Sequence, residues 1–384
     1  MKMSTRWWKV LVVVVMVSSV VLAPMAESSC FPAIFNFGDS TSDTGGIHAS
    51  FPGSTPAEYS PYGMTYFGKP NVRYSDGRLL IDFLATGLGL NFLSPYLQSV
   101  NSNFQQGANF ATAGATVQQV TYLSPFTLPY QIKQFNEFYA NVQSTLSAGA
   151  GTSRLPTSMS IFSDALYTIA IGGNDFTYGY TRLGMGPSQV EGYLPQVVSG
   201  ITNAIQDLYN YGARNFMVWD IEPQGCLPYM LTLIQHTASD LDANGCLYNY
   251  NNAATYYNGL LKTALTNLQG SLSGANVIYL GMYDIKYNLM TNLTQNGFVS
   301  GVKACCGVPS AFNYNTQVNC GSTGTVNGVY LAAQTCTNPA QYTVWDGVHN
   351  TDAGNHYLAH QVFSGNYFNP QFNQLVDGCD LSPF

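Results

Sequence analysis

Short runs of apolar residues alternate along the chain with longer stretches in which apolar residues recur every three or four positions. Five of the short runs are predicted to be β-strands: residues 33–37, 109–112, 165–171, 215–219 and 276–280. Most of them are apolar at nearly every position rather than at every second one. This pattern is typical of a parallel sheet that is covered on both faces.

The longer stretches have the period of amphipathic helices. The clearest of them are residues 79–88, 190–209 and 256–268. In the first, the pattern places Leu80, Phe83 and Leu84 on one face and Asp82 on the opposite face. Strands that alternate with helices predict a doubly wound α/β domain.

Two segments interrupt this alternation because they are rich in Pro, Gly, Asn and Tyr. We expect residues 47–72 and 304–342 to be loops, the second one held by disulfides. No change of composition marks a domain boundary, so residues 29–384 are expected to form a single domain. With 46% hydrophobic residues, a chain of this length can bury a large core.

Charged residues are scarce, at 9% of the chain, and the formal net charge is −7. Soluble domains usually contain roughly a quarter charged residues, so a neutral, polar surface is expected here. No basic patch is present that could neutralise phosphates, and no nucleic-acid partner is predicted. The oligomeric state is left open by the sequence.

The first 28 residues have the pattern of a secretory signal peptide. Lys2, Arg6 and Lys9 precede an apolar run at residues 10–22, and small residues flank Glu27. A membrane anchor is the alternative, but the run is short for a membrane span and no second adequate run follows. We therefore expect a secreted, extracellular protein, in the apoplast or cell wall, without stable membrane insertion.

The eight cysteines agree with export. All of them lie after the apolar run, at Cys30, Cys226, Cys246, Cys305, Cys306, Cys320, Cys336 and Cys379. An even number in an exported chain predicts disulfides. The C-x-x-C spacing typical of zinc ligands does not occur, and neither a metal nor another cofactor is predicted. Asn292 begins the one glycosylation sequon.

The first predicted strand leads directly into Gly38, Asp39 and Ser40. This order places a hydroxyl at the carboxyl edge of the sheet, where open α/β sheets bind ligands. If a helical turn begins just after Ser40, its free N–H groups would point at a developing negative charge. The alternative is that Ser40 only caps a helix, a role that Asp43 could also fill.

Two later segments could supply further hydrogen-bond donors. Residues 107–115 (GANFATAGA) are mostly small, so their backbone N–H groups can approach a ligand closely, although small residues also serve tight packing. Residues 171–176 (IGGNDF) place Asn174 just past a buried strand, from which its side-chain N–H can reach an oxyanion. A plain strand-ending turn is the alternative interpretation of this second segment.

Near the end of the chain, Asp346 and His349 lie three positions apart at the beginning of a helical stretch. Asp346 would accept the Nδ1 proton of His349, and Nε2 would then face the serine as a general base. His48, in the loop after the serine, is the second candidate for the base. His356 and His360 have the spacing of residues on a helix surface.

Taken in order, these four segments resemble the blocks of GDSL lipases and esterases, also called SGNH hydrolases, and most of all the plant extracellular branch. FNFGDSTSDTG resembles the first block, GANFATAGA the second, GGNDF the third and WDGVHNTDAGN the last. The resemblance extends over essentially the whole chain after the signal segment. It implies a flavodoxin-like three-layer α/β/α sandwich with a parallel five-stranded sheet.

The resemblance also implies roles for individual residues. The catalytic residues would be the nucleophile Ser40, with Asp346 and His349. The oxyanion hole would consist of the Ser40 N–H, the Gly114 N–H and the Asn174 side chain, with Gly107 as the alternative to Gly114. Cys226 with Cys246, and the group Cys305, Cys306, Cys320 and Cys336, are similar to disulfide positions of the plant branch. A Cys30–Cys379 pair follows only by elimination.

The expected activity is therefore that of a GDSL-type serine esterase or lipase acting on small-molecule or glycan esters. Acetyl, phenolic or short-chain acyl esters would be cleaved through an acyl-enzyme. One alternative is an acyltransferase that uses the same residues with a sugar or alcohol acceptor. Another is a noncatalytic carbohydrate-binding protein whose tyrosines and Trp345 stack on sugars. The G-x-S-x-G, HExxH and P-loop patterns are absent, which disfavours those other hydrolase classes.

Overall fold

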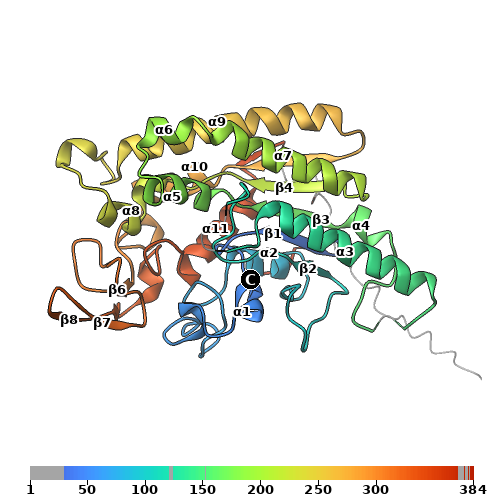
Figure 1. Cartoon of the computed structure of the whole chain (residues 1–384), viewed down its shortest axis with the longest axis horizontal. Coiled ribbons are helices and arrows are strands. Elements are labelled where there is room, and N and C mark those ends of the chain that lie inside the picture. Colours follow the sequence, from blue (N-terminus) through green and yellow to red (C-terminus); the bar gives the residue numbers. More distant parts are fainter. Residues whose placement is uncertain (1–29, 121–123, 152, 371–375, 377–378, 380) are drawn as a thin grey trace, which may run out of the picture.

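A central sheet of five parallel strands organises the computed structural model, which describes residues 30–120, 124–151, 153–370, 376, 379 and 381–384. The strands are β1 (Ile34–Gly38), β2 (Gly107–Asn109), β3 (Leu166–Ala170), β4 (Asn215–Trp219) and β5 (Asn276–Leu280). They lie in the order β2-β1-β3-β4-β5, and Figure 1 labels the first four of them. The predicted α/β fold with five parallel strands is confirmed. The expected signal peptide, residues 1–28, lies outside the described residues.

Side chains of successive strand residues pack alternately into two buried clusters, one on each face of the sheet. In β1, Phe35 and Phe37 belong to one cluster, and Ile34 belongs to the other. In β4, Val218 and Met217 divide in the same way. Burial on both faces is the reason why these strands are apolar at nearly every position.

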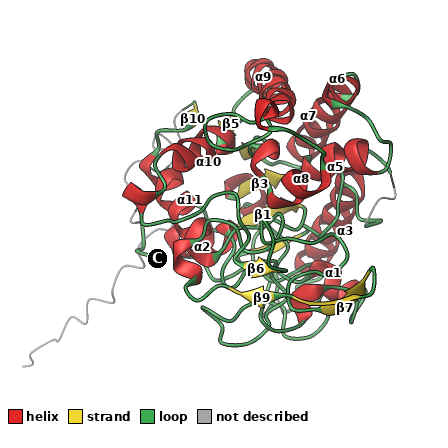
Figure 2. Ribbon diagram, turned by 90° about the vertical axis from the view of Figure 1, so that its left-hand side faces the viewer, coloured by secondary structure: helices red, strands yellow, loops and turns green. Residues whose placement is uncertain are grey.

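Helices cover both faces, which gives the expected three layers (Figure 2). One layer contains α3 (Leu128–Ser147), α5 (Gly173–Thr181), α6 (Pro187–Glu191), α7 (Leu194–Asn210) and α9 (Tyr248–Ser271). The other contains α2 (Leu80–Gly87), α10 (Met282–Thr291) and α11 (Asp352–Ser364). Three further short helices are α1 (Gly46–Ser50), α4 (Ile161–Asp164) and α8 (Pro228–Leu233), of which α4 and α8 pack into the same cluster as the first layer.

The second predicted strand is placed differently in the structure. Strand β2 covers Gly107–Asn109, whereas the apolar run predicted residues 109–112. A Cβ atom at Gly107 would lie 1.9 Å from the carbonyl oxygen of Ile34 in β1. Only glycine therefore permits β1 and β2 to approach each other at this point. A run of apolar residues does not indicate that a glycine is needed there, so it misplaced the strand.

Two further features were not predicted from the pattern. A short strand β10 (Phe368–Asn369) pairs antiparallel with β5 at the edge of the sheet. Asp82, expected opposite the apolar face of α2, is instead buried. It receives two hydrogen bonds of 2.7 Å from the Arg73 guanidinium, and these satisfy its charge inside the core.

The cysteine-rich segment contains four short strands among its loops: β6 (Cys306–Gly307), β7 (Thr323–Val326), β8 (Val329–Ala332) and β9 (Gln334–Thr335). Disulfides hold it as expected, and their pairs are Cys305–Cys336 and Cys306–Cys320. The other two pairs are Cys226–Cys246 and Cys30–Cys379. Within the described part of the chain, none of the helices is both long enough and apolar enough to cross a membrane.

Candidate active site

Ser40 lies on the turn that follows β1, at the carboxyl edge of the sheet. The Ser42 N–H donates to the Asp39 carbonyl oxygen (3.1 Å), and the Thr41 N–H donates to the Asp39 carboxylate (3.0 Å), which fixes this turn. The first helix begins only at Gly46, so a helical turn directly after Ser40, considered above, does not form. The Ser40 side chain does not cap a helix, because its Oγ contacts an imidazole.

That imidazole belongs to His349, whose Nε2 lies 2.8 Å from the Oγ of Ser40. On the other side of the ring, Nδ1 lies 2.9 Å from Oδ1 and 2.8 Å from Oδ2 of Asp346. The loop that carries both residues is closed by the Asp346 carboxylate, whose Oδ1 accepts the N–H groups of Val348 and His349 at 2.9 Å. The three residues predicted from the sequence are therefore in hydrogen-bond contact.

Asp346 is held in its ionised form. Burial by itself would raise the pKa of this carboxyl group, but His349 and the two backbone N–H donors outweigh burial, so the pKa is lowered. An ionised Asp346 accepts the Nδ1 proton of the ring and leaves the Nε2 lone pair directed at the serine. This is the arrangement in which an imidazole can remove a proton from a hydroxyl.

His48, the second candidate for the base, is directed elsewhere. Its Nδ1 lies 2.9 Å from the Glu58 carboxylate. His356 and His360 lie on α11 with ring centroids 4.5 Å apart, and the ring of Phe384 packs against both. The structure thus brings only one of the five histidines, His349, onto Ser40.

Ser40 and His349 open into a cavity of about 600 Å³. Most of its other lining side chains are aromatic or small and uncharged: Ile47, Phe51, Ser54, Thr55, Tyr74, Ala113, Gly114, Asn174, Thr177, Tyr229, Tyr314 and Val348. Trp345, expected to be available for stacking on sugars, has no exposed surface and lies in the core. Stacking on a bound ligand is therefore possible for the tyrosines of this cavity but not for Trp345.

The predicted oxyanion donors Gly114 and Asn174 line this same cavity. Gly107 lies at the beginning of β2, paired with Ile34, so the structure places Gly114 rather than Gly107 beside the serine. One N–H of the Asn174 side chain donates to the Ala115 carbonyl oxygen (3.0 Å), which fixes the amide group in place. An amide nitrogen carries two hydrogens, and the second is available for a ligand.

Two buried carboxylates brace the loop that carries Gly114. Asp43 accepts the Ala113 N–H at 2.8 Å and also N–H groups at the beginning of α1, the capping role considered above. Asp175 accepts the N–H groups of Val117 and Gln118 at 2.8 and 2.9 Å. Burial raises the pKa of Asp175 to about 7. The sequence indicated these two bracing residues only in that Asp43 and Asp175 each lie inside a glycine-containing motif.

Two tyrosines near His349 and Asp346 were also missed, because neither follows a recognisable motif. The Tyr74 ring lies against the His349 ring, with centroids 4.8 Å apart. The Tyr62 hydroxyl donates to Oδ2 of Asp346 at 2.9 Å. Among the residues that the structure describes, no group of three or more His, Cys, Asp or Glu side chains has the arrangement of a metal site.

Comparison with known proteins agrees with the arrangement of these residues. A profile of the GDSL-like lipase/acylhydrolase family matches residues 34–362, from the first strand to the last helix. The chain belongs to this family. The predicted relationship to GDSL lipases and esterases is confirmed, and with it the class of enzyme, a hydrolase that acts on ester bonds.

Several plant proteins are similar to this GDSL hydrolase over nearly its full length. GDSL esterase/lipase At4g01130 of Arabidopsis thaliana is 43% identical over 354 residues, which cover 90% of this chain and 91% of the relative. A Hevea brasiliensis protein named "Esterase" is 37% identical, covering 91% and 89%. A relative with a different name, Alpha-L-fucosidase 3 of Arabidopsis thaliana, is 40% identical and covers 91% and 95%.

Proposed function

We propose that this GDSL hydrolase is a secreted serine esterase in which Ser40 is the nucleophile, His349 the general base and Asp346 the residue that orients the base. The observation that carries the proposal is the 2.8 Å contact between Nε2 of His349 and Oγ of Ser40. The direct contact of Nδ1 with an ionised carboxylate supports it further, because it selects the tautomer that a base needs.

In the proposed reaction, His349 removes the proton of the Ser40 hydroxyl while Oγ attacks the ester carbonyl carbon. The carbonyl oxygen becomes an oxyanion, and the N–H groups of Ser40 and Gly114 and the Asn174 amide are the proposed donors to it. The alkoxide leaves with the proton from His349, and an acyl-enzyme remains. Water, deprotonated by the same ring, then attacks this ester and releases the carboxylic acid, which restores Ser40.

The lining of the cavity favours an uncharged substrate. His349 is its one titratable residue with a charged form at neutral or acidic pH, since the others are tyrosines and uncharged side chains. Rings such as Phe51, Tyr74 and Tyr229 offer faces for aromatic or sugar groups. We propose acetyl, phenolic or short-chain acyl esters of small molecules or cell-wall glycans as substrates.

Hydrolysis of a glycoside, suggested by the name of one relative, is not supported by this cavity. Glycosidases generally use two carboxyl groups that flank the scissile bond. None of the described residues that line the cavity carries a carboxylate. Asp346, which contacts His349 behind the cavity, already has both oxygens engaged by His349, Tyr62 and backbone N–H groups.

Secretion is part of the proposal and has two supports. The basic and apolar pattern of residues 1–28 is that of a signal peptide. All eight cysteines are paired in four disulfides, which persist in oxidising compartments and are rare in the cytosol. Detection of the processed chain in the extracellular fluid of the producing tissue tests this point separately from activity.

Labelling with a fluorophosphonate probe tests the assignment of the nucleophile. The wild-type protein should be labelled, and the Ser40→Ala variant should not be labelled at all. Ser54→Ala is the matched control, because Ser54 lines the same cavity without contacting His349, and it should be labelled normally. Full labelling of Ser40→Ala would refute the assignment of Ser40 as the nucleophile, whereas a wild-type protein that is not labelled would favour the noncatalytic carbohydrate-binding alternative.

A further inference from the structure

Tyr62 extends the line of hydrogen bonds that connects Ser40, His349 and Asp346. We propose that Tyr62 is a positioning residue for catalysis, whose hydroxyl holds the Asp346 carboxylate in the orientation that His349 requires. The inference rests on the proposed function and adds a fourth residue to it. Tyr62 does not line the cavity that contains Ser40, although it lines a smaller adjoining one with His349 and Asp346, and its hydroxyl would act through Asp346.

The hydrogen bonds at Asp346 show why a fourth donor matters. Its Oδ1 accepts the N–H groups of Val348 and His349 at 2.9 Å, and the imidazole Nδ1 lies within reach of both oxygens. Oδ2 has no backbone donor among the described residues, and it receives the Tyr62 hydroxyl at 2.9 Å. Without this hydroxyl, the imidazole would be the only group to satisfy Oδ2 of a buried carboxylate.

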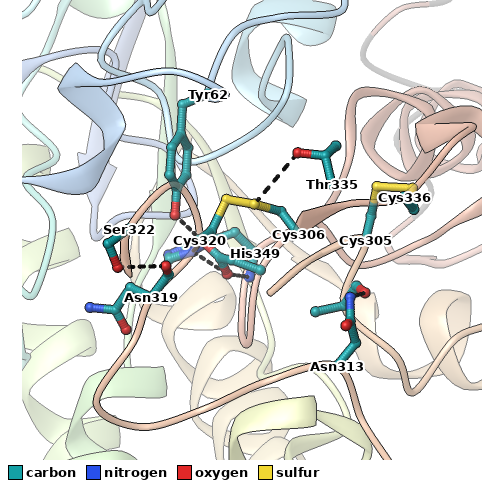
Figure 3. Close-up of a disulfide and its surroundings, with 12 residues drawn as sticks. Tyr62, Cys305, Cys306, Asn313, Asn319, Cys320, Ser322, Thr335, Cys336 and His349 are labelled. Atoms are coloured by element: carbon teal, nitrogen blue, oxygen red, sulfur yellow. Dashed lines mark hydrogen bonds and ion pairs between the residues drawn. A yellow bond between two sulfur atoms is a disulfide. The ribbon is translucent and has the colours of Figure 1, made fainter. Parts of the chain in front are cut away.

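The surroundings of Tyr62 hold its hydroxyl in place. The side chain is 2% exposed, and its ring meets the Trp345 ring edge to face at a centroid distance of 5.9 Å. It packs in one buried cluster with Cys306 and Cys320, whose disulfide lies beside it in Figure 3. The Cys306 N–H donates to the Trp345 carbonyl oxygen at 2.6 Å, directly before Asp346 in the chain.

The direction of the hydrogen bond stays the same over the working pH range. Burial, together with the neighbouring Asp346 charge, raises the pKa of Tyr62 well above its usual value, so the hydroxyl keeps its proton. The lowered pKa of Asp346 keeps the acceptor ionised. The other titratable groups that face these residues are Tyr74 and Tyr314 beside Tyr62, and Asp39 beside His349.

The proposal predicts a change in the pH dependence of catalysis when the hydroxyl is removed. In Tyr62→Phe the ring and its packing remain, but Oδ2 of Asp346 loses a charge-assisted hydrogen bond. The carboxylate then favours a protonated His349 more strongly. The acidic limb of kcat/KM against pH should move upward by about one pH unit, which corresponds to about a tenfold loss of rate at a fixed acidic pH.

Tyr167→Phe is the matched control. Tyr167 is also fully buried, and its hydroxyl donates one hydrogen bond of 2.8 Å to the Phe162 carbonyl oxygen, within the core cluster on one face of the sheet. Both variants should lose stability, but only Tyr62→Phe should shift the pH profile, measured with p-nitrophenyl acetate. An unshifted profile in Tyr62→Phe, or an equal shift in Tyr167→Phe, would overturn the proposal.

A second measurement covers the case in which Tyr62→Phe does not fold. Site-specific 3-fluorotyrosine at position 62 keeps the shape of the side chain and makes the hydroxyl a stronger donor. The acidic limb should then move to lower pH, opposite to the Phe variant, and a profile identical to that of the wild type contradicts the inference. Failure of the proposed function is recognised separately, because Ser40→Ala would then still be labelled by the fluorophosphonate.

Discussion

The imidazole Nε2 of His349 lies 2.8 Å from the Oγ of Ser40, although the two residues are 309 positions apart in the chain. Ser40 follows β1, which lies between β2 and β3 in the sheet. His349 precedes α11, the last helix of the chain, which packs against one face of the sheet. Both lie at the carboxyl edge of the parallel strands. The turn that carries Ser40 and the loop that carries His349 are each fixed by backbone N–H groups that donate to an aspartate carboxylate, Asp39 in the turn and Asp346 in the loop, as a preorganised site requires.

Acidification should slow the reaction because His349 accepts a proton only when it is neutral. On the acidic side, the rate of fluorophosphonate labelling should fall about tenfold per pH unit, as general-base catalysis predicts. The measurement is the labelling rate across neutral and acidic pH. His349→Gln should abolish labelling, whereas His48→Gln, which removes the other candidate base, should keep the wild-type profile. A rate that stays constant into acid would contradict the assignment.

Asn174→Ala should lower kcat by roughly 10²–10³ with a much smaller effect on KM, because an oxyanion donor acts mainly in the transition state. Steady-state kinetics with p-nitrophenyl acetate measure both constants. The variant also loses the hydrogen bond to Ala115, so thermal unfolding should be recorded beside the kinetics. Thr177→Ala is the control, since Thr177 lines the same cavity one helical turn later. An equal loss of kcat there would point to general damage of the cavity.

Most of the sheet could be predicted from the sequence because burial on both faces leaves a direct mark on strand composition. The strands at 215–219 and 276–280 were predicted to the residue. Strand β10 left no such mark, since two residues at the sheet edge are too short for a pattern. Asp82 was misplaced for a different reason: periodicity assigns a charged residue to the surface and does not anticipate a buried partner such as Arg73.

The mutual contact of Ser40, Asp346 and His349 could be predicted because each lies in a motif whose proposed chemistry requires that residue type. Tyr62 could not, since it reaches Asp346 from a loop that the sequence marks only as rich in Pro, Gly and Tyr. The choice between Gly114 and Gly107 also needed the structure. Both glycines have positive φ, but one begins a strand and the other lines the cavity. A short motif specifies the local backbone conformation, but it does not show which of its two glycines will line the cavity.

Removal of the Cys306–Cys320 disulfide should abolish activity at temperatures at which the rest of the protein is still folded. These cysteines close a loop of 14 positions, for which loop-closure entropy predicts a stabilisation of about 3 kcal/mol. The Cys306 N–H also donates to the Trp345 carbonyl oxygen next to Asp346, so the change should be transmitted to the loop that carries Asp346 and His349. In the double variant Cys306→Ser/Cys320→Ser, esterase activity should be lost at temperatures below the unfolding midpoint measured by circular dichroism.

The Cys30–Cys379 pair provides the control for this prediction. It joins positions 349 residues apart and packs on the α2 and α11 side of the sheet. Its removal should lower the unfolding midpoint, because it closes the longer loop, while activity and unfolding should be lost together. If both double variants lost activity only on unfolding, the disulfide at Cys306 would have no separate role in holding the loop that carries Asp346 and His349.

The raised pKa of Asp220 should make the free energy of unfolding fall as the pH rises from about 4 to about 7. Burial raises the pKa of this carboxyl group from 3.8 to about 7, although the Tyr279 hydroxyl and the Tyr283 N–H donate to it. Between these values the unfolded chain has lost the proton and the folded chain still binds it. The stabilising contribution is therefore complete below pH 4 and is lost as the pH rises through 7.

Asp220→Asn removes this dependence and keeps the shape of the side chain. Its carbonyl oxygen can accept the Tyr283 N–H, and its amide can donate to the Tyr279 oxygen, so both contacts are preserved. The free energy of unfolding of the variant minus that of the wild type should increase from pH 4 to pH 7 and then level off, as measured by urea unfolding. Asp207→Asn, at an exposed carboxyl group on α7, should show no such trend. If the free energies of unfolding of Asp220→Asn and the wild type ran parallel against pH, Asp220 would ionise in the folded protein as it does in the unfolded chain. Its two hydrogen-bond donors would then outweigh the effect of its burial.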